Sequence, residues 1–137
     1  MNTSSRRKFI KDSGMAAMAG TAIFALQQPN HLNDMKKVFI HHVYFWLKNP
    51  GNAADRDKLI EGLTKLSKVK TIKNFHIGKP AGTNRDVIDS SYAVSWFVIF
   101  DNDVDQASYQ VDPIHLKFVE DYSSLWQKVV VYDTVDA

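Results

Sequence analysis

The chain contains no cysteine among its 137 residues. This absence excludes structural disulfides, thiolate metal sites, a thiol nucleophile and a lipid-modified cysteine behind an export signal. The sequence also lacks a glycine-rich phosphate loop, a serine nucleophile elbow and a dinucleotide fingerprint, so nucleotide chemistry is unsupported. The length suits one domain with a buried core and is too short for two.

Excess positive charge is confined to the first 25 residues. That segment holds four basic residues and one acidic residue, and the rest of the chain holds 13 basic and 14 acidic residues. The formal charge therefore changes from +2 for the full chain to −1 without the segment. A near-neutral domain with interleaved lysines and acids lacks the positive field that phosphate binding needs, which excludes nucleic acid as the main partner.

Residues 1–25 contain, in order, the basic segment and the apolar run of an export signal. Arg6 and Arg7, followed by Lys8 and Phe9, precede a weakly apolar run rich in alanine, glycine and methionine. The arginine pair with this mild run resembles a twin-arginine signal, which exports proteins that are already folded. We expect a periplasmic or otherwise exported protein, membrane-anchored if the signal stays uncleaved. The alternative is a disordered basic tail.

Residues 26–36 have no apolar period, which indicates a linker ahead of a domain at residues 37–137. The apolar run before the linker is too short and weak for a stable membrane span in the mature protein. The cleavage position stays open, because small residues occur at 20, 22 and 25. Met35 is an alternative, internal start.

Residues 38–47 predict a central strand with two bulky faces. In a strand, successive side chains point to opposite faces of the sheet. Both faces carry side chains that are unfavourable in contact with water, so each face is expected to be buried against another element or subunit. The two sets are His41, Val43, Phe45 and Leu47 on one face, and His42, Tyr44 and Trp46 on the other.

The remaining pattern predicts an α+β fold, in which a ferredoxin-like βαββαβ antiparallel sheet has its helices on one face. Asn52 follows a turn and caps a helix that ends near Lys68, and Asp112 caps a later helix with Pro113 at its first position. The other expected elements are strands at residues 72–77, 92–100 and 126–134, a short helix at 101–109, and a polar loop or lid at 79–90.

The sheet face opposite the helices would display Tyr44, Trp46 and other large side chains. A contiguous apolar surface of this kind marks an association site. Two such sheets paired face to face close a barrel between subunits, so we expect a homodimer that forms a dimeric α+β barrel.

Three segments resemble the stress-responsive A/B-barrel (Dabb) family: residues 41–48, the stretch 109–119 with its Pro-x-His segment, and residues 126–129. The resemblance covers about residues 37 to 134 and implies a dimeric α+β barrel. A plant polyketide cyclase of similar sequence uses cofactor-free acid and base chemistry. That resemblance implies His41, Tyr109 and His115 as candidate catalytic residues, which line a cavity between sheet and helices. Asp112 departs from the histidine that many relatives carry before the proline.

His115 falls in the first turn of its expected helix, where the positive end of the helix dipole disfavours imidazolium. A neutral imidazole can take a proton from a carbon acid while a tyrosine hydroxyl donates to the developing oxyanion. Each candidate also has a structural interpretation. His115 can be a hydrogen-bonded histidine at a helix start, His41 a satisfied core histidine, and Tyr109 a core aromatic residue with its hydroxyl at the rim.

The sequence predicts neither a cofactor nor a metal site. His41 and His42 point apart, and His31 and His76 lie in unrelated contexts without adjacent carboxylates. No sequence feature selects a haem ligand either.

Two functions follow from this pattern. The favoured one is an exported Dabb-domain protein that binds a small hydrophobic ligand in a sheet–helix cavity, with the 79–90 loop helping to hold it. The alternative is a cofactor-free cyclase, lyase or isomerase acting on a carbonyl compound such as a polyketide. In that alternative His115 is the base, Tyr109 the hydrogen-bond donor and His41 the group that orients the substrate.

Overall fold

The computed structural model describes residues 37–137, so the predictions made for residues 1–36 lie outside the described part of the chain. No helix within residues 37–137 is long and apolar enough to cross a membrane. The elements, in chain order, are β1 (Phe39–Leu47), α2 (Ala53–Leu66), β2 (Ile72–Gly78), β3 (Val94–Phe100), α3 (Asp103–Val111), α4 (Pro113–Tyr122), a 3-10 turn (Ser123–Leu125) and β4 (Trp126–Val135).

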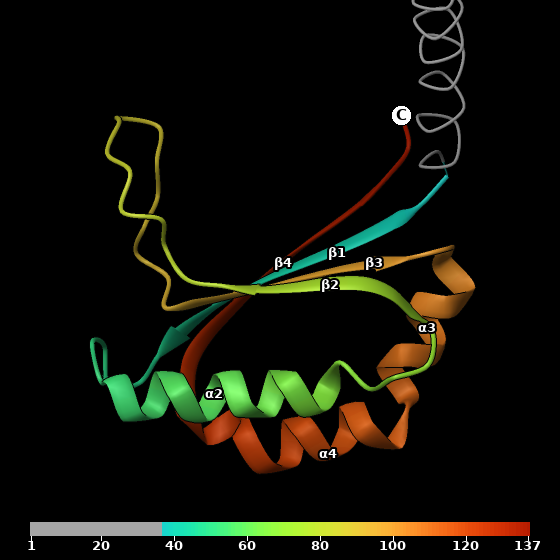
Figure 1. Ribbon diagram of the computed structural model, residues 1–137, viewed down its shortest axis with the longest axis horizontal. Helices are drawn as coiled ribbons and strands as arrows, with labels where there is room; N and C mark the ends of the chain where they lie inside the picture. The colour runs from blue at the N-terminus through green and yellow to red at the C-terminus, as the bar shows by residue number, and fades with distance from the viewer. Residues whose placement is uncertain (1–36) are drawn as a thin grey trace, which may run out of the picture. The chain divides into compact units, whose positions relative to one another are not determined.

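The four strands form one sheet in the order β2-β3-β1-β4, and every neighbouring pair is antiparallel. The helices lie on one face of this sheet, with α2 and α4 side by side beneath it (Figure 1). This is the ferredoxin-like α+β fold that the order of elements predicted, and the prediction is confirmed.

Local signals place the starts of α2 and α4 where the sequence predicted them. The turn before α2 closes with the Asn52 N–H donating to the Asn49 carbonyl at 3.1 Å, and Gly51 has φ +80°, which favours glycine. The Asn52 side chain then accepts from the Asp55 N–H at 3.0 Å. Asp112 caps α4 in the same way, accepting from the Ile114 N–H at 2.8 Å.

The predicted boundaries differ from the observed ones by about two residues. Helix α2 ends at Leu66. The Ser67 N–H makes the last α-helical bond, to the Leu63 carbonyl at 2.9 Å, and the next bond, from the Lys68 N–H to the Lys65 carbonyl at 3.2 Å, closes a tighter turn. Helix α3 begins at Asp103 rather than 101, because the side chain of Asn102 accepts from the Asp105 N–H at 2.8 Å and caps it there.

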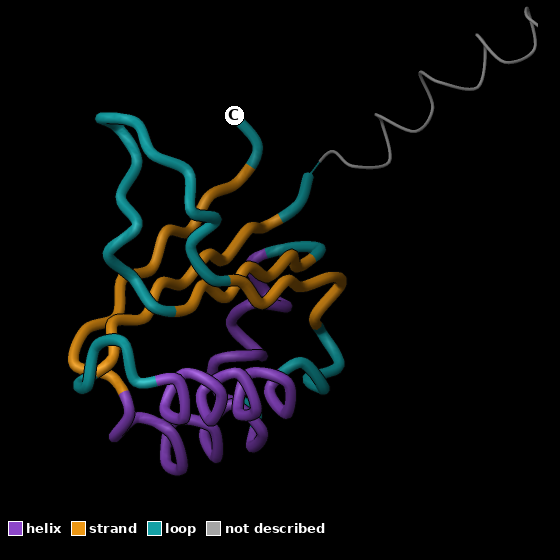
Figure 2. Tube along the Cα trace, turned by 60° about the vertical axis from the view of Figure 1, so that its left-hand side comes forward, coloured by secondary structure: helices purple, strands orange, loops and turns teal. Residues whose placement is uncertain are grey.

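The apolar core lies between the sheet and the helices. Along β1 every second residue from His41 to Leu47 is buried, and the residues between them are half-buried, as the two-faced pattern predicted. The segment between β2 and β3 leaves the sheet on the side away from the helices (Figures 1 and 2). The largest fully buried side chains include Leu59 and Leu63 of α2, Trp96 and Phe100 of β3, and Tyr109 of α3.

Gly62, in the middle of α2, packs directly against Tyr122 at the end of α4. A Cβ added at Gly62 would lie 2.8 Å from the ring atoms Cγ and Cδ2 of the buried Tyr122. In an open helix site Gly→Ala stabilises by about 1 kcal/mol. Here we expect Gly62→Ala to destabilise the domain by roughly 1–3 kcal/mol through overpacking, measured by urea unfolding.

The exposed neighbour Glu61 provides the control, since Glu61→Ala should change the free energy of unfolding by no more than about 0.5 kcal/mol. A gain of stability in Gly62→Ala would contradict this packing of α4 on α2.

Candidate functional site

A cavity of about 170 Å³ lies between the sheet and the helices, and we call it the imidazole cavity. It is similar in volume to an apolar protein cavity of about 150 Å³ that binds benzene. Its walls bring together all three candidate residues of the sequence analysis. The lining residues are His41, Val43, Phe45, Leu66, Trp96, Tyr109, Gln110, His115, Phe118, Val119, Trp126, Val129 and Val131.

Tyr109 lies between the two candidate histidines. Its ring centroid is 5.8 Å from that of His41 and 4.7 Å from that of His115. His41 comes from the central strand β1, Tyr109 from the last turn of α3, and His115 from the first turn of α4. The short connection between α3 and α4 therefore places a phenol and an imidazole side by side over the sheet.

His41 is paired with a carboxylate that the sequence analysis did not identify. Its Nδ1 lies 2.6 Å from Oδ1 of Asp133 on β4, and the two residues are directly opposite in the strand register. The His41 side chain is 8% exposed and that of Asp133 is 45% exposed. With Nδ1–H donated to Asp133, the ring orientation of His41 is fixed and its Nε2 is left for another partner.

The hydroxyl of Tyr109 is buried rather than at the rim that the structural interpretation assumed. The residue is 1% exposed, and its Oη accepts a hydrogen bond from Nε1 of Trp96 at 3.0 Å. Burial raises the pKa of Tyr109 well above its ordinary value, and the Trp96 bond opposes this only in part. The phenol is therefore protonated at neutral pH, with its own proton free to be donated.

His115 is half-buried, and its Nδ1 is buried without a hydrogen-bond partner among residues 37–137. Its pKa is lowered, first by burial and also by the nearby His41. Hydrogen bonding of the protonated ring to the Gln110 backbone and the charge of Asp112 oppose the shift. The neutral ring expected from the sequence is therefore supported. The main cause is desolvation by burial.

The sequence did not indicate Asp133 or Trp96 as site residues. Each makes a hydrogen bond to a candidate residue that is not its neighbour along the chain. Asp133 is separated from His41 by 92 residues. The one available signal was its position on β4, where alternation puts a carboxylate on the same face as Val129 and Val131. Nothing in the pattern around Trp96 marks it as a hydrogen-bond donor to a tyrosine.

The polar loop predicted as a lid does not cover the imidazole cavity. No residue from 79 to 90 lines it, and the loop leaves the sheet on the opposite side from the helices (Figure 2). The expectation that this loop helps to hold a ligand there is therefore wrong. The reason is that β2 ends and β3 begins at the end of the sheet opposite α3, and the loop between them rises from the face that the helices do not cover (Figure 1).

Within the described part of the chain, no group of three or more histidine, aspartate or glutamate side chains is arranged to hold a metal ion. The pair His41–Asp133 supplies only two such groups. The polar groups that line the imidazole cavity thus include two imidazoles, one phenol and the amide of Gln110, and the carboxylate of Asp133 acts on the cavity through His41.

The model of the Stress responsive A/B Barrel Domain (Dabb) family matches residues 39–136. The chain belongs to this family. The resemblance seen in the sequence is thereby confirmed, and the match includes every strand and helix of the described domain. None of the curated proteins matches this Dabb chain by sequence.

Several solved structures have the same fold as this Dabb domain. A Dabb-family protein with a ferredoxin-like fold from Mesorhizobium loti is 20% identical, with a TM-score of 0.61, and the match covers 73% of this chain and 97% of that one. A dimeric ferredoxin-like protein of unknown function from Thermobifida fusca is 17% identical, with a TM-score of 0.61 and coverage of 74% and 92%.

A hydroxynitrile lyase from Passiflora edulis is also similar, at 17% identity and a TM-score of 0.63, with coverage of 74% of this chain and 94% of that one. At these identities the likeness shows the fold alone. Dimeric proteins and an enzyme thus occur among the structures that share this fold.

The lowered pKa of His115 predicts an acid dependence of stability. The unfolded chain takes up this proton near the ordinary value of 6.5, and the folded chain takes it up at lower pH. The contribution of His115 to stability is therefore complete above about pH 6.5 and is lost as pH falls through the folded pKa. We expect ring NMR signals of His115 to titrate below 6.5, and His115→Gln to flatten the acid limb of the unfolding free energy.

His42 also has a pKa lowered by burial, and it lies on the other sheet face, so His42→Gln is the matched control. That variant should leave the titration midpoint of His115 unchanged. A midpoint at or above 6.5 in the wild type would contradict the buried neutral ring.

Proposed function

We propose that this Dabb-family protein binds a small, largely apolar ligand in the imidazole cavity. The observation that carries the proposal is the Nδ1 atom of His115, which lines a cavity and is buried without a partner in the described domain. An unsatisfied buried polar atom costs about 1–3 kcal/mol, and a ligand or water that pairs with it removes that cost.

The size and lining of the cavity limit the ligand. A volume of about 170 Å³ admits roughly one aromatic ring with a small substituent. The lining is mostly aliphatic and aromatic, and the polar groups free to meet a ligand include Nε2 of His41, the ring of His115 and the hydroxyl proton of Tyr109. These features favour a single-ring compound that carries one carbonyl or hydroxyl oxygen.

A matched pair of probes tests this proposal. Acetophenone has a carbonyl that ethylbenzene lacks, so we expect it to bind more tightly, by roughly fivefold for a hydrogen bond worth about 1 kcal/mol. His115→Leu should weaken acetophenone binding by a similar factor and leave ethylbenzene unaffected. Binding is measured by NMR titration of the cavity residues.

Val111→Ala is the control, because Val111 is 70% exposed and does not line the imidazole cavity. Its affinities should equal those of the wild type. Absence of binding by both probes, or equal affinity of both for His115→Leu and wild type, would contradict the proposal.

A second candidate function is acid–base chemistry on a carbonyl compound, and the His41–Asp133 pair favours it. A neutral His115 beside a protonated Tyr109 can take a proton from carbon while Tyr109 donates to the carbonyl oxygen. A hydroxynitrile lyase has a similar fold, and this likeness supports an enzymatic function only through the shared fold. If the protein is an enzyme, His115→Gln abolishes turnover while ligand binding and thermal stability persist; lost stability would indicate a structural role.

We also propose that the protein is a homodimer, closed by the sheet face that the helices leave open. That face carries an aromatic cluster in which His42 lies 4.4 Å from Tyr44 and 5.1 Å from Phe97, and Tyr44 lies 4.9 Å from Tyr92. Tyr132 extends the cluster onto β4, 6.0 Å from Tyr44. An exposed apolar face of this kind supports association, and a protein of similar fold is dimeric.

Light scattering should therefore give the mass of two chains at micromolar concentration. Tyr132 is 64% exposed, so Tyr132→Glu leaves the fold of each subunit intact while placing a charge in the open face. We expect this variant to be a monomer. Val104→Glu changes a 70% exposed residue on α3, away from that face, and should stay dimeric. A monomeric wild type would refute the dimer.

Export is proposed from the leader sequence alone. Arg6 and Arg7 head the twin-arginine-like segment, and Lys11 follows them in the same basic stretch. Twin-arginine transport depends on the arginine pair, so Arg6→Lys with Arg7→Lys should retain the protein in the cytoplasm of its host, whereas Lys11→Arg should not. Cell fractionation measures both, and equal export of the double variant would contradict the proposed route.

A further inference from the structure

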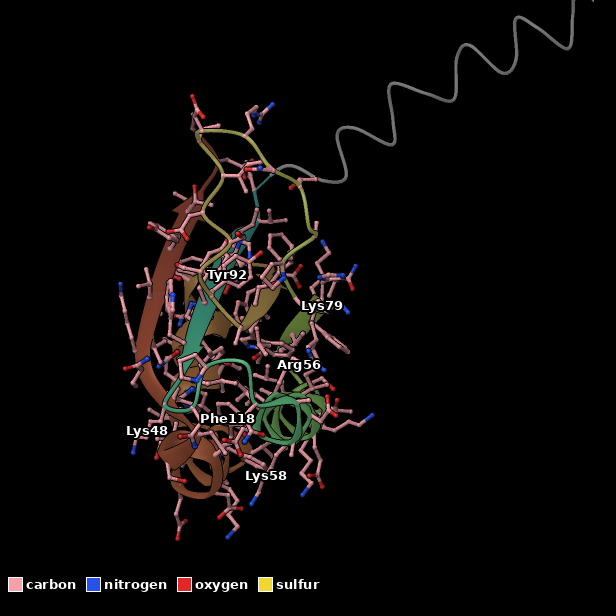
Figure 3. All side chains as sticks on the ribbon, turned by 90° about the vertical axis from the view of Figure 1, so that its left-hand side faces the viewer. Lys48, Arg56, Lys58, Lys79, Tyr92 and Phe118 are labelled. Atoms are coloured by element: carbon pink, nitrogen blue, oxygen red, sulfur yellow. The ribbon has the colours of Figure 1, made fainter. Side chains whose placement is uncertain are left out.

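A second and larger cavity, of about 380 Å³, lies at one end of the sheet, and we call it the end pocket. The turn from β1 into α2 forms one side, and the segments that enter and leave the 79–90 loop form the other. Figure 3 looks onto this end of the molecule, where Arg56, Lys79 and Tyr92 are labelled. The end pocket shares no lining residue with the imidazole cavity.

The end pocket has an aromatic wall that is held in place. Nε1 of Trp46 donates to Oγ of Ser91 at 3.0 Å, and that hydroxyl donates to Oδ1 of Asp89 at 2.6 Å. Tyr92 is the next residue after Ser91, so the two hydrogen bonds of the Ser91 hydroxyl also restrain the backbone that carries Tyr92. Gln127, another lining residue, is also held, because its Nε2 donates to the Leu47 carbonyl at 3.0 Å.

The charge of the lining has one sign. Arg56 and Lys79 line the end pocket, and no acidic side chain does. The ion pair of Arg56 is weak, because its Nε lies 3.6 Å from a carboxylate oxygen of Asp57, which is 70% exposed. Lys79 has no ion pair within residues 37–137. The guanidinium fork and the ammonium are therefore both available to an anion.

We propose that the end pocket binds a small organic carboxylate with a flat apolar body. Arg56 and Lys79 hold the carboxylate, and the rings of Trp46 and Tyr92 contact the body. Inorganic phosphate would satisfy the cations and leave the aromatic wall uncovered, so an aromatic acid is the better match in this pocket. This site is independent of the imidazole cavity and of any chemistry there. Its aromatic wall, Trp46 and Tyr92, belongs to the sheet face proposed above to close the dimer, so the site is tested in the native assembly.

The indole N–H groups of the three tryptophans allow a direct test, because they divide between the cavities. Trp46 lines the end pocket, whereas Trp96 and Trp126 line the imidazole cavity. The full chain, in its native assembly, is titrated by NMR with 1-naphthoate, with its neutral counterpart 1-naphthamide, and with inorganic phosphate. We expect 1-naphthoate to shift the Trp46 signal and to bind at least tenfold more tightly than either of the others.

Arg56→Gln and Lys79→Gln should each weaken 1-naphthoate binding, by about tenfold and about threefold. Lys58→Gln is the matched control, because Lys58 is exposed on the same helix as Arg56 and does not line the end pocket (Figure 3). Its affinity should equal that of the wild type.

Equal affinity for 1-naphthoate and 1-naphthamide would overturn the carboxylate site, as would an unchanged affinity in Arg56→Gln. Shifts confined to Trp96 and Trp126 would also overturn it, and would place the probe in the imidazole cavity. The two proposals can therefore be refuted separately, since acetophenone binding tests the imidazole cavity and the Trp46 signal tests the end pocket.

Discussion

Strand β1 lies at the centre of the sheet and carries bulky side chains on both faces, so neither face of the sheet can be left to water. It pairs with β3 on one side and β4 on the other, and its alternate residues are buried or half-buried. The helices cover the His41 face, and the His42 face keeps its rings packed against one another. The imidazole cavity and the proposed dimer face are thus opposite sides of one strand.

The parts of the fold that the sequence predicted are those determined by neighbouring residues. Asn52 and Asp112 cap helices through contacts two or three residues away, and the alternation of β1 is visible in the strand itself. The family resemblance then placed His41, Tyr109 and His115 around one cavity, as the structure does. Their roles in binding or catalysis are a separate matter, because burial and proximity do not determine chemistry.

The parts that escaped the sequence depend on strand register and on contacts distant along the chain. Asp133 reaches His41 only because β1 and β4 pair in a particular register, and a shift by one residue would turn the carboxylate to the other face. The polarity of residues 79–90 predicts a loop or a lid, but it does not determine the direction in which the loop leaves the sheet. In the structure its two ends, with Trp46 and Arg56, instead form the end pocket.

The two histidines of the imidazole cavity differ in what they leave unpaired. Nδ1 of His41 is paired with Asp133, whereas Nδ1 of the neutral His115 ring is buried with no partner at hydrogen-bond geometry in the described domain. If His115 had only a structural role, we would expect its buried nitrogen to have a hydrogen-bond partner, because a buried nitrogen without one lowers the stability of the fold. A bound ligand that supplies the missing hydrogen bond resolves this conflict. The asymmetry therefore favours His115 as the residue that meets the ligand, and His41 as the residue that holds the cavity wall in position beside Tyr109.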